Sequence, residues 1–286
     1  MGPDQSFLYL YALIPEVEEQ HTPLESFEGI DGKKAYAKRM GGITAVVCPV
    51  DSTVYSEKSL EERMNDLSWL QEKALHHHHS LLRLNEEYTV IPLKFCTLFQ
   101  GEDRLSQVVE ENRERVLSLF GKLTGTVEWN IKIFCDEIQL REYVTQNHPV
   151  VEEKRKELES LSPGRRFFEK KRLDQMVEEE MDREIARLCG EIHEGLKELS
   201  AESAVKRNWD REMSGRKEAM HWNSVYLLDT KQRSAFLEKA EACREEYRSI
   251  GLSIEPSGPW PSYHFASLQP KEGGAGAGTG ERTVSK

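Results

Sequence analysis

Residues 89–99 read Thr-Val-Ile-Pro-Leu-Lys-Phe-Cys-Thr-Leu-Phe, a β-branched run that is broken by a proline and followed by alternating large side chains. The β-branched residues favour the pleated conformation, so the first part of this stretch predicts a strand. Pro92 has no backbone N–H to donate, which restricts the strand to a sheet edge, a strand end or a bulge. We therefore expect an interrupted strand at an edge or bend of a small sheet.

The residues around this stretch predict an α+β domain. Strands are expected over residues 7–14, 33–40, 43–50 and 88–95, and helices over residues 59–81 and 103–124. Gly41-Gly42 separates two of the strands and can supply the positive φ angles of a tight hairpin turn. Both helices carry apolar residues at steps of three and four, which indicates one buried face.

The second half of the chain predicts another domain of the same class. Strands are expected over residues 126–134, 222–229 and 252–255, with a helix over residues 230–248. Residues 126–134 alternate between apolar and polar side chains, as in a half-buried strand. The succession of strands and helices predicts a small, mostly antiparallel sheet covered by helices in each domain.

Residues 150–200 are highly charged and favour helix, with an interruption at Ser162-Pro163-Gly164. Serine followed by proline is typical of an N-cap and the first helical position, so a new helix is expected to begin there. An apolar stripe at alternating steps of four and three then follows: Leu173, Val177, Met181, Ile185, Leu188, Ile192, Leu196 and Leu199. This pattern predicts a long two-helix hairpin or a coiled-coil-like arm, whose single stripe faces one partner surface.

Length and composition indicate two domains in a charged, soluble chain. The chain has 286 residues, of which 38% are hydrophobic and 31% charged, and its net charge is −11. We expect domains over residues 1–125 and 126–270, and a disordered glycine-rich tail over residues 271–286. The acidic balance disfavours general attraction to nucleic acid or anionic lipid.

The cysteines and the chain start predict a cytoplasmic protein. The five cysteines are scattered and form no Cys-x-x-Cys pair, as expected for thiols kept reduced in the cytosol. The sequence shows neither a basic signal-peptide start nor an apolar run long enough to cross a bilayer.

Several motifs suggest chemistry, but each has a simpler interpretation. His76 to His79 are successive, so on a helix they point about 100° apart and cannot converge on one metal ion. The glycines around Lys122 lack the glycine spacing of a phosphate-binding loop. Cys96 and Cys135 lie in apolar strand contexts that favour packing over nucleophilic reactivity. We expect no catalytic residue, metal, cofactor or small-molecule substrate.

Two further segments suggest contact with a partner. Residues 165–172 hold five basic residues around Phe167 and Phe168, which suits a protein-docking patch or a salt-bridged helix face better than a nucleic-acid site. Residues 256–265 contain three prolines, Trp260 and Tyr263, and predict a rigid tail that caps the core across the sheet or an exposed docking strip.

The amino-acid sequences of these segments resemble those of a known family. His79 to Leu84 together with residues 89–99 resemble the signature of the gas vesicle protein F/L family, whose members usually carry glycine where this chain has Cys96. The ending Gly258-Pro259-Trp260-Pro261 resembles the family's C-terminal motif, and residues 164–168 are a weaker match. Together the matches cover residues 7–265.

The resemblance implies a function that the residues alone do not indicate. It implies a non-enzymatic accessory or minor structural protein of gas vesicle assembly, cytoplasmic and associated with the shell, with domains related to the ferredoxin-like fold. Its implied partners are the gas vesicle shell protein A and other gas vesicle accessory proteins. The candidate partner-binding residues are Pro92, Lys94, Phe95, Phe99, Arg165, Arg166, Phe167, Trp260 and Tyr263.

Two alternatives stay open at this point. A nucleic-acid-binding protein would use the basic helix start at Arg165 and Arg166 and show steeply salt-dependent binding. An enzyme with an unrecognised site would show a concave pocket with convergent titratable side chains.

Overall fold

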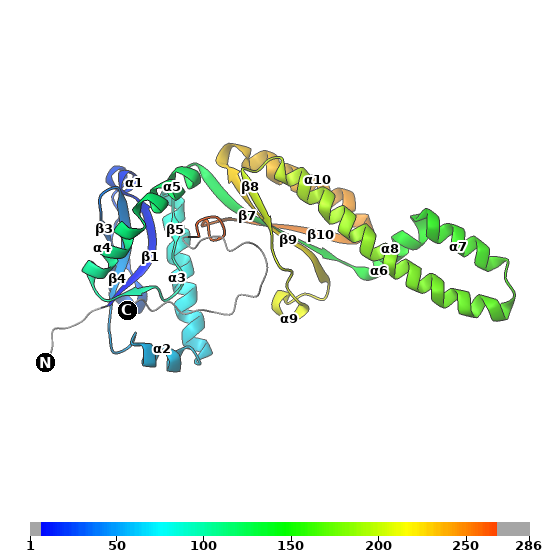
Figure 1. Cartoon of the computed structure of the whole chain (residues 1–286), viewed down its shortest axis with the longest axis horizontal. Helices are drawn as coiled ribbons and strands as arrows, with labels where there is room; N and C mark the ends of the chain where they lie inside the picture. The colour runs from blue at the N-terminus through cyan, green and yellow to red at the C-terminus, as the bar shows by residue number, and fades with distance from the viewer. Residues whose placement is uncertain (1–6, 268–286) are drawn as a thin grey trace. The chain divides into compact units, whose positions relative to one another are not determined.

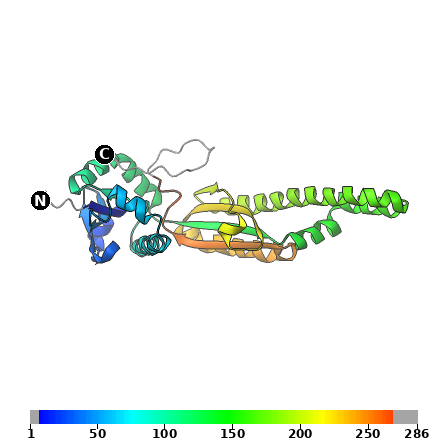
Figure 2. The same ribbon diagram turned by 90° about the horizontal axis from the view of Figure 1, so that it is seen from below.

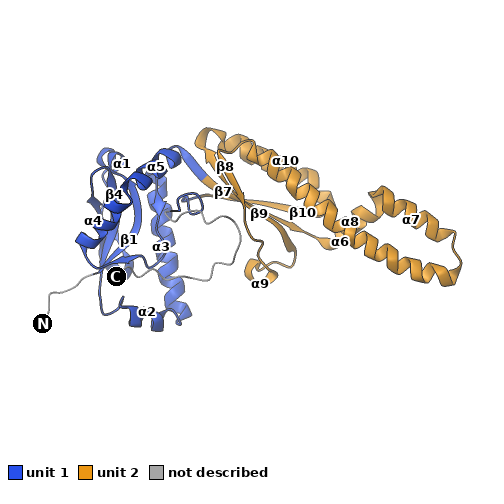
Figure 3. Ribbon diagram, viewed as in Figure 1, with its two compact units in different colours: residues 1–127, 260–286 blue, residues 128–259 orange. Residues whose placement is uncertain are grey.

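The computed structural model describes residues 7–267, which form two compact units (Figure 3). Residues 7–127 and 260–267 form unit 1, and residues 128–259 form unit 2. The chain is an α+β protein with two antiparallel sheets, as the sequence predicts. The tail expected over residues 271–286 lies outside the described residues.

Unit 1 contains a sheet with the strand order β2-β3-β4-β1-β5, in which β6 also pairs with β1 (Figure 1). The strands are β1 (Phe7–Pro15), β2 (Phe27–Glu28), β3 (Lys34–Arg39), β4 (Ile43–Val50), β5 (Ile91–Pro92) and β6 (Leu98–Phe99). The predicted hairpin of β3 and β4 is confirmed, and Gly41 and Gly42 turn it with φ angles of 63° and 93°.

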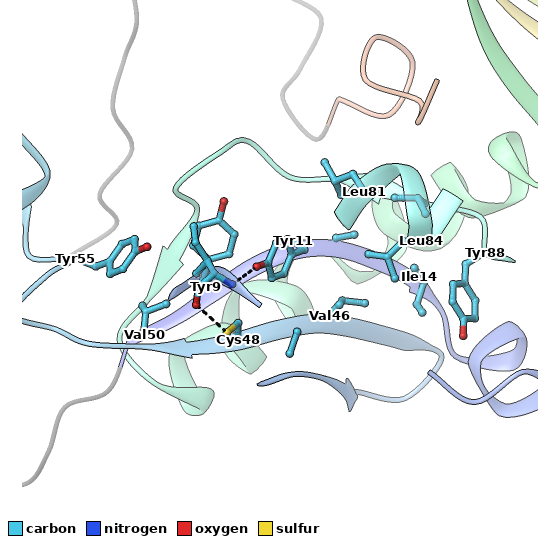
Figure 4. Packing of buried hydrophobic residues seen from close by; sticks show 14 residues of the cluster. Tyr9, Tyr11, Ile14, Val46, Cys48, Val50, Tyr55, Leu81, Leu84 and Tyr88 are labelled. Atoms are coloured by element: carbon cyan, nitrogen blue, oxygen red, sulfur yellow. Dashed lines mark hydrogen bonds between the residues drawn. The ribbon is translucent and has the colours of Figure 1, made fainter. Parts of the chain in front are cut away.

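Helices cover both faces of this sheet. They are α1 (Glu16–His21), η1 (Ile30–Gly32), α2 (Glu57–Arg63), α3 (Leu67–Glu87), α4 (Glu102–Glu111) and α5 (Arg113–Leu123). Tyr9 and Tyr11 of β1 pack with Leu81 and Leu84 of α3 in a buried cluster (Figure 4). Helix α5 contacts β1 and β4 as well. Strand β1 is therefore buried on both sides, which explains its continuous apolar run.

Both helices predicted in this half are divided by a short polar residue. The first is interrupted before Asp66, whose carboxylate accepts the N–H groups of Ser68 and Trp69 and starts α3. The second is interrupted at Asn112, whose side-chain amide donates to the carbonyl of Val108. Asp and Asn compete in this way for local backbone groups, so they end helices that the apolar pattern alone would continue.

Unit 2 contains a sheet with the strand order β10-β7-β9-β8. Its elements are β7 (Thr126–Cys135), α6 (Glu137–Asn147), α7 (Pro149–Glu159), α8 (Pro163–Lys197), β8 (Glu202–Val205), α9 (Arg211–Ser214), β9 (Ala219–Asp229), η2 (Thr230–Gln232), α10 (Arg233–Tyr247), η3 (Arg248–Ile250) and β10 (Leu252–Trp260). Tyr226 of β9 contacts His193 of α8 and Phe236 of α10, so these two helices lie on one face of the sheet. The short strand β8 has no counterpart in the sequence-based prediction.

The other face of the unit 2 sheet is less open than the sequence predicts. Residues 126–134 form a strand as expected, but its polar side is partly covered by the segment between β8 and β9. The ammonium of Lys132 lies 3.6 Å from the centre of the Trp209 ring, and the Arg216 guanidinium lies 4.4 Å from that of Phe134. The apolar side of the strand is buried as the sequence predicts, at Trp129, Ile131 and Ile133. On the polar side Asn130 and Lys132 remain partly exposed, whereas Glu128 is buried.

The predicted helical hairpin is confirmed. Helices α7 and α8 lie side by side, and α8 runs for 35 residues (Figures 1 and 2). Ser162 occupies the N-cap position and Pro163 the first turn, although the Ser162 hydroxyl makes no capping hydrogen bond. The apolar stripe is buried from Val177 to Leu196, covered by α6, α7, β9 and α10. The apolar stripe therefore packs against other elements of the same chain rather than against another protein.

The last strand is longer than expected. Strand β10 runs from Leu252 to Trp260 rather than ending at Glu255. It therefore includes the Gly258-Pro259 peptide, which is cis.

Candidate partner-binding residues

The nine candidate residues fall into two groups. Pro92, Lys94, Phe95, Phe99, Trp260 and Tyr263 lie in unit 1, and Arg165, Arg166 and Phe167 lie in unit 2.

Pro92 lies at the edge of the unit 1 sheet, as its missing donor predicts. It ends β5, which is the last strand in the sheet order. Of the strand expected over residues 88–95 only Ile91–Pro92 form one, because α3 runs on to Glu87 and the backbone turns after Leu93. Thr97 donates from its N–H and its hydroxyl to the carbonyl of Lys94, at 3.1 and 2.6 Å. Lys94 is exposed at this turn, whereas Phe95 and Phe99 are half-buried.

Cys96 adopts the backbone conformation that glycine favours. Its φ angle is 62°, in the left-handed region, where a Cβ atom is strained. This chain thus forms a left-handed turn with a cysteine rather than a glycine. The Cys96 side chain packs at the margin of the buried cluster of unit 1.

A buried histidine holds this turn against the rest of unit 1. His77 of α3 lies 3.1 Å through Nε2 from the carbonyl of Leu93, and 2.7 Å through Nδ1 from the hydroxyl of Tyr9. A carbonyl only accepts, so Nε2 carries the proton and the Tyr9 hydroxyl donates to Nδ1. The N–H of Cys96 donates in turn to the Tyr9 oxygen. Burial lowers the pKa of His77 to about 4, so the imidazole is neutral.

The neighbouring histidines reach different partners. His76 Nε2 lies 3.2 Å from the Tyr11 hydroxyl, and His78 Nδ1 lies 2.8 Å from the Tyr263 hydroxyl. Burial lowers the pKa of both imidazoles. Within residues 7–267, no group of three or more His, Cys, Asp or Glu side chains is placed to hold a metal ion. The histidine run therefore acts as a set of hydrogen-bonding anchors.

Trp260 and Tyr263 belong to a segment that packs on the helices of unit 1. Their rings lie 5.6 and 6.0 Å from that of His78 on α3. Phe265 is buried beside Lys122 of α5, whose ammonium lies 5.4 Å from the ring centre. The segment is tied down as a capping tail, but on helices rather than across the sheet as expected. Tyr263 keeps 43% of its surface exposed and can still meet a partner.

Arg165, Arg166 and Phe167 lie at the start of α8, where the hairpin turns. Phe167 is 76% exposed, and its neighbour Phe168, which the sequence-based candidates omit, is 74% exposed. Arg166 serves the fold, because its guanidinium donates to the carbonyls of Glu159 and Leu161 at the end of α7. The sequence could have indicated Phe168 as a candidate contact residue, because it is the second member of an aromatic pair among basic residues.

Burial disfavours the thiolate form of the cysteines. Burial raises the pKa of the Cys96 and Cys135 thiols to about 12 and that of Cys48 to about 11. Thiols of this kind are protonated at neutral pH and react poorly. Separately, each helix within residues 7–267 is too short or too polar to span a lipid bilayer.

Two antiparallel sheets with their helices define this chain as an α+β protein. The chain belongs to the family described as gas vesicle synthesis protein GvpL/GvpF, whose family model matches residues 7–267. The resemblance seen in the sequence is therefore confirmed.

Relatives match most of the chain, and a solved structure shares its fold. Gas vesicle protein L of Streptomyces sp. (strain CB03234) is 24% identical over 245 residues, which cover 85% of this chain and 87% of that relative. Gas vesicle protein F of Nostoc sp. (strain PCC 7120) is 24% identical over 265 residues, covering 92% and 99%. The crystal structure of gas vesicle protein GvpF from Anabaena sp. PCC7120 superposes with a TM-score of 0.69 at 21% identity, over 93% of this chain and 100% of that one.

Proposed function

We propose that this chain is a non-enzymatic accessory or minor structural protein of gas vesicle assembly. The observation that carries the proposal is the family match, which spans all of the described residues. In this role it binds the gas vesicle shell protein A and other gas vesicle accessory proteins, in the cytoplasm and at the vesicle shell. A small hydrophobic shell protein exposes apolar surface that must be shielded before it joins the shell.

We place one contact surface in unit 1, around the β5 edge and the C-terminal segment. This edge is poorly suited to adding a strand, because β5 and β6 have two residues each and Pro92 has no N–H. Side chains are the better means of contact. Lys94 and Tyr263 are the most exposed of the six candidates there, and Phe95, Phe99 and Trp260 are half-buried beside them in the sequence.

We also infer that unit 2 is related to the ferredoxin-like fold. The chain order β7, α6 to α8, β8, β9, α10, β10 is a β-α-β-β-α-β succession, and the first strand lies between the last and the third. Helices on one face of the sheet agree with this relationship. Unit 1 departs from that order, since the β3–β4 hairpin follows β1 before any long helix.

Deletion and co-purification test the assembly role. We expect a gas-vesicle-forming strain that lacks this chain to lose most of its vesicles, and a plasmid copy to restore them. A tagged full-length chain should co-purify with the shell protein when the two are co-expressed. Normal vesicles in the deletion strain, together with no co-purification, would contradict the proposal.

A further inference from the structure

We propose that the start of α8 is a docking site for a short acidic segment of another protein, one that presents apolar side chains on one face. We call this site the hairpin tip and define it as Arg165, Phe167, Phe168, Lys170 and Lys171. The inference deepens the proposed function, on which it rests in taking the partner to be a gas vesicle protein.

The aromatic pair supplies the apolar part of the site. Phe167 and Phe168 are 76% and 74% exposed, and their rings contact each other edge to face at 5.8 Å. Adjacent exposed phenylalanines differ from the scattered apolar residues of an ordinary surface, because one partner can cover both. Covering them removes apolar surface from water, which favours association.

The cations of the tip lack the neutralising partners found farther along the helix. Arg183, Arg187 and Lys197 each pair with a glutamate three positions away. Within the described chain, by contrast, no carboxylate lies within ion-pair distance of the tip's cations, Arg165, Lys170 and Lys171. Two other basic residues of the same turns already have partners. The Arg166 guanidinium donates to the carbonyl of Glu159 at the end of α7, and Arg172 forms an ion pair with Glu169 at 2.8 Å.

Helical spacing limits the length of the docked segment. Lys171 is three and four positions beyond the two phenylalanines, so it lies on the same side of α8 one turn on. One turn farther Asp174, and two turns farther Glu178 and Glu179, reverse the charge of the exposed face. An acidic segment that followed α8 beyond Lys171 would meet these carboxylates. The tip therefore suits one or two turns of an acidic amphipathic helix.

The charge of the whole chain favours a protein segment over nucleic acid or membrane. With a net charge of −11, the chain repels an extended polyanion at most of its surface. A short peptide interacts electrostatically only with the charges close to it, because salt screens charges beyond about 8 Å at physiological ionic strength. The positive charge of the hairpin tip can therefore attract a short acidic segment although the whole chain is acidic.

Peptide binding to the full-length chain tests the site directly. The probe is a fluorescent helical peptide of about 15 residues in which two central turns carry Leu on one face and Glu on the other, while the remaining positions are Ala and Gln. Its comparison peptide carries Lys in place of Glu. We expect only the acidic peptide to bind. The double variants Phe167→Ala/Phe168→Ala and Lys170→Glu/Lys171→Glu should each weaken binding about ten-fold or more.

Matched controls separate the tip from general surface effects. Ile138→Ala removes an apolar side chain that is 72% exposed on α6, and Lys231→Glu reverses an exposed charge before α10. Both should bind the peptide like the unmodified chain, and circular dichroism melting should show all variants folded. Unchanged affinity of both tip variants would overturn the proposal. So would binding of phosphatidylcholine–phosphatidylglycerol vesicles or a DNA duplex, in preference to the peptide, through the same residues.

A second arm uses the purified shell protein and accessory proteins as immobilised partners, one at a time. A partner that binds the unmodified chain and loses affinity for both tip variants supports the inference. A partner that binds all variants equally contradicts the assignment of the hairpin tip as the docking site but agrees with the proposed function. If the unmodified chain binds none of these proteins, the proposed function fails, while the peptide measurements still decide the chemistry of the tip.

Discussion

At the scale of single residues, the histidine run shows how one short sequence can tie several distant segments to a helix. Successive positions of α3 point about 100° apart. His76 therefore meets Tyr11, His77 meets Tyr9 and Leu93, and His78 meets Tyr263. These partners come from β1, from the turn after β5 and from the C-terminal segment. Their distance along the chain is the reason that the sequence alone could not pair them.

The buried His77 makes stability depend on pH. Its pKa is lowered to about 4 in the fold, against about 6.5 in an unfolded chain. Because the unfolded state binds the proton first, the neutral imidazole stabilises the fold fully above pH 6.5. This contribution is lost as the pH falls from about 6.5 to about 4 and amounts to on the order of 3 kcal/mol. Urea unfolding at a series of pH values measures it.

A substitution pair isolates this effect. His77→Gln should reduce the loss of stability between pH 6.5 and 4, whatever its effect at pH 7. His79→Gln alters an exposed neighbour in the same helix and should leave the pH profile unchanged. Identical profiles for His77→Gln and the unmodified chain would show that His77 does not carry the dependence.

The turn at Cys96 predicts an unusual order of stabilities. Both Cys96→Ala and Cys96→Gly remove the sulfur, but only alanine keeps a Cβ atom at a φ angle of 62°. Glycine avoids the left-handed strain of roughly 1–2 kcal/mol, which exceeds its extra unfolded-state entropy. We expect the glycine variant to be more stable than the alanine variant by about 1 kcal/mol in denaturant unfolding. The reverse order, usual for helices and strands, would contradict the strain argument.

At the scale of elements, periodicity predicted the regular parts and missed the interruptions. The stripe of α8, the Gly41-Gly42 hairpin and the strand β7 all follow from local pattern. The breaks at Asp66 and Asn112 depend on single side chains that bond nearby backbone, which periodicity does not register. Strand β8 is four residues long and gains its conformation from pairing with β9. Such a strand has little signal of its own.

The stripe of α8 predicts a sharp contrast between two substitutions on one helix. Ile185 is 4% exposed beneath the covering elements, so Ile185→Ala should cost about 2–5 kcal/mol through lost burial and a cavity. Phe168 is 74% exposed at the hairpin tip, so Phe168→Ala should change stability by about 0.5 kcal/mol or less. Thermal and denaturant unfolding of both variants measure the difference. A large loss in Phe168→Ala would mean that this ring is covered within the chain.

At the scale of the whole molecule, the candidate contacts depend on which unit each segment joins. Sequence patterns drew attention to Phe167 and to residues 256–265, predicted as a capping tail or an exposed docking strip, because aromatic and proline-rich segments stand out locally. They could not show that Trp260 returns to unit 1 and lies beside His78, since the two residues are far apart in the sequence. A segment near the C-terminus therefore packs on a helix of unit 1.

This arrangement predicts that a change near the C-terminus loosens the N-terminal unit. Phe265 is 5% exposed and lies by Lys122 of α5, so Phe265→Ala should cost about 3–5 kcal/mol. Because local opening follows the stability of each cooperative region, amide hydrogen exchange should rise in α3, α5 and β1 and stay unchanged in α8 and β9. Leu252→Ala, which removes a side chain 3% exposed in unit 2, should give the opposite pattern. If Phe265→Ala instead accelerated exchange mainly in unit 2, the C-terminal segment would be stabilising that unit and the two-unit division of the chain would have to be redrawn.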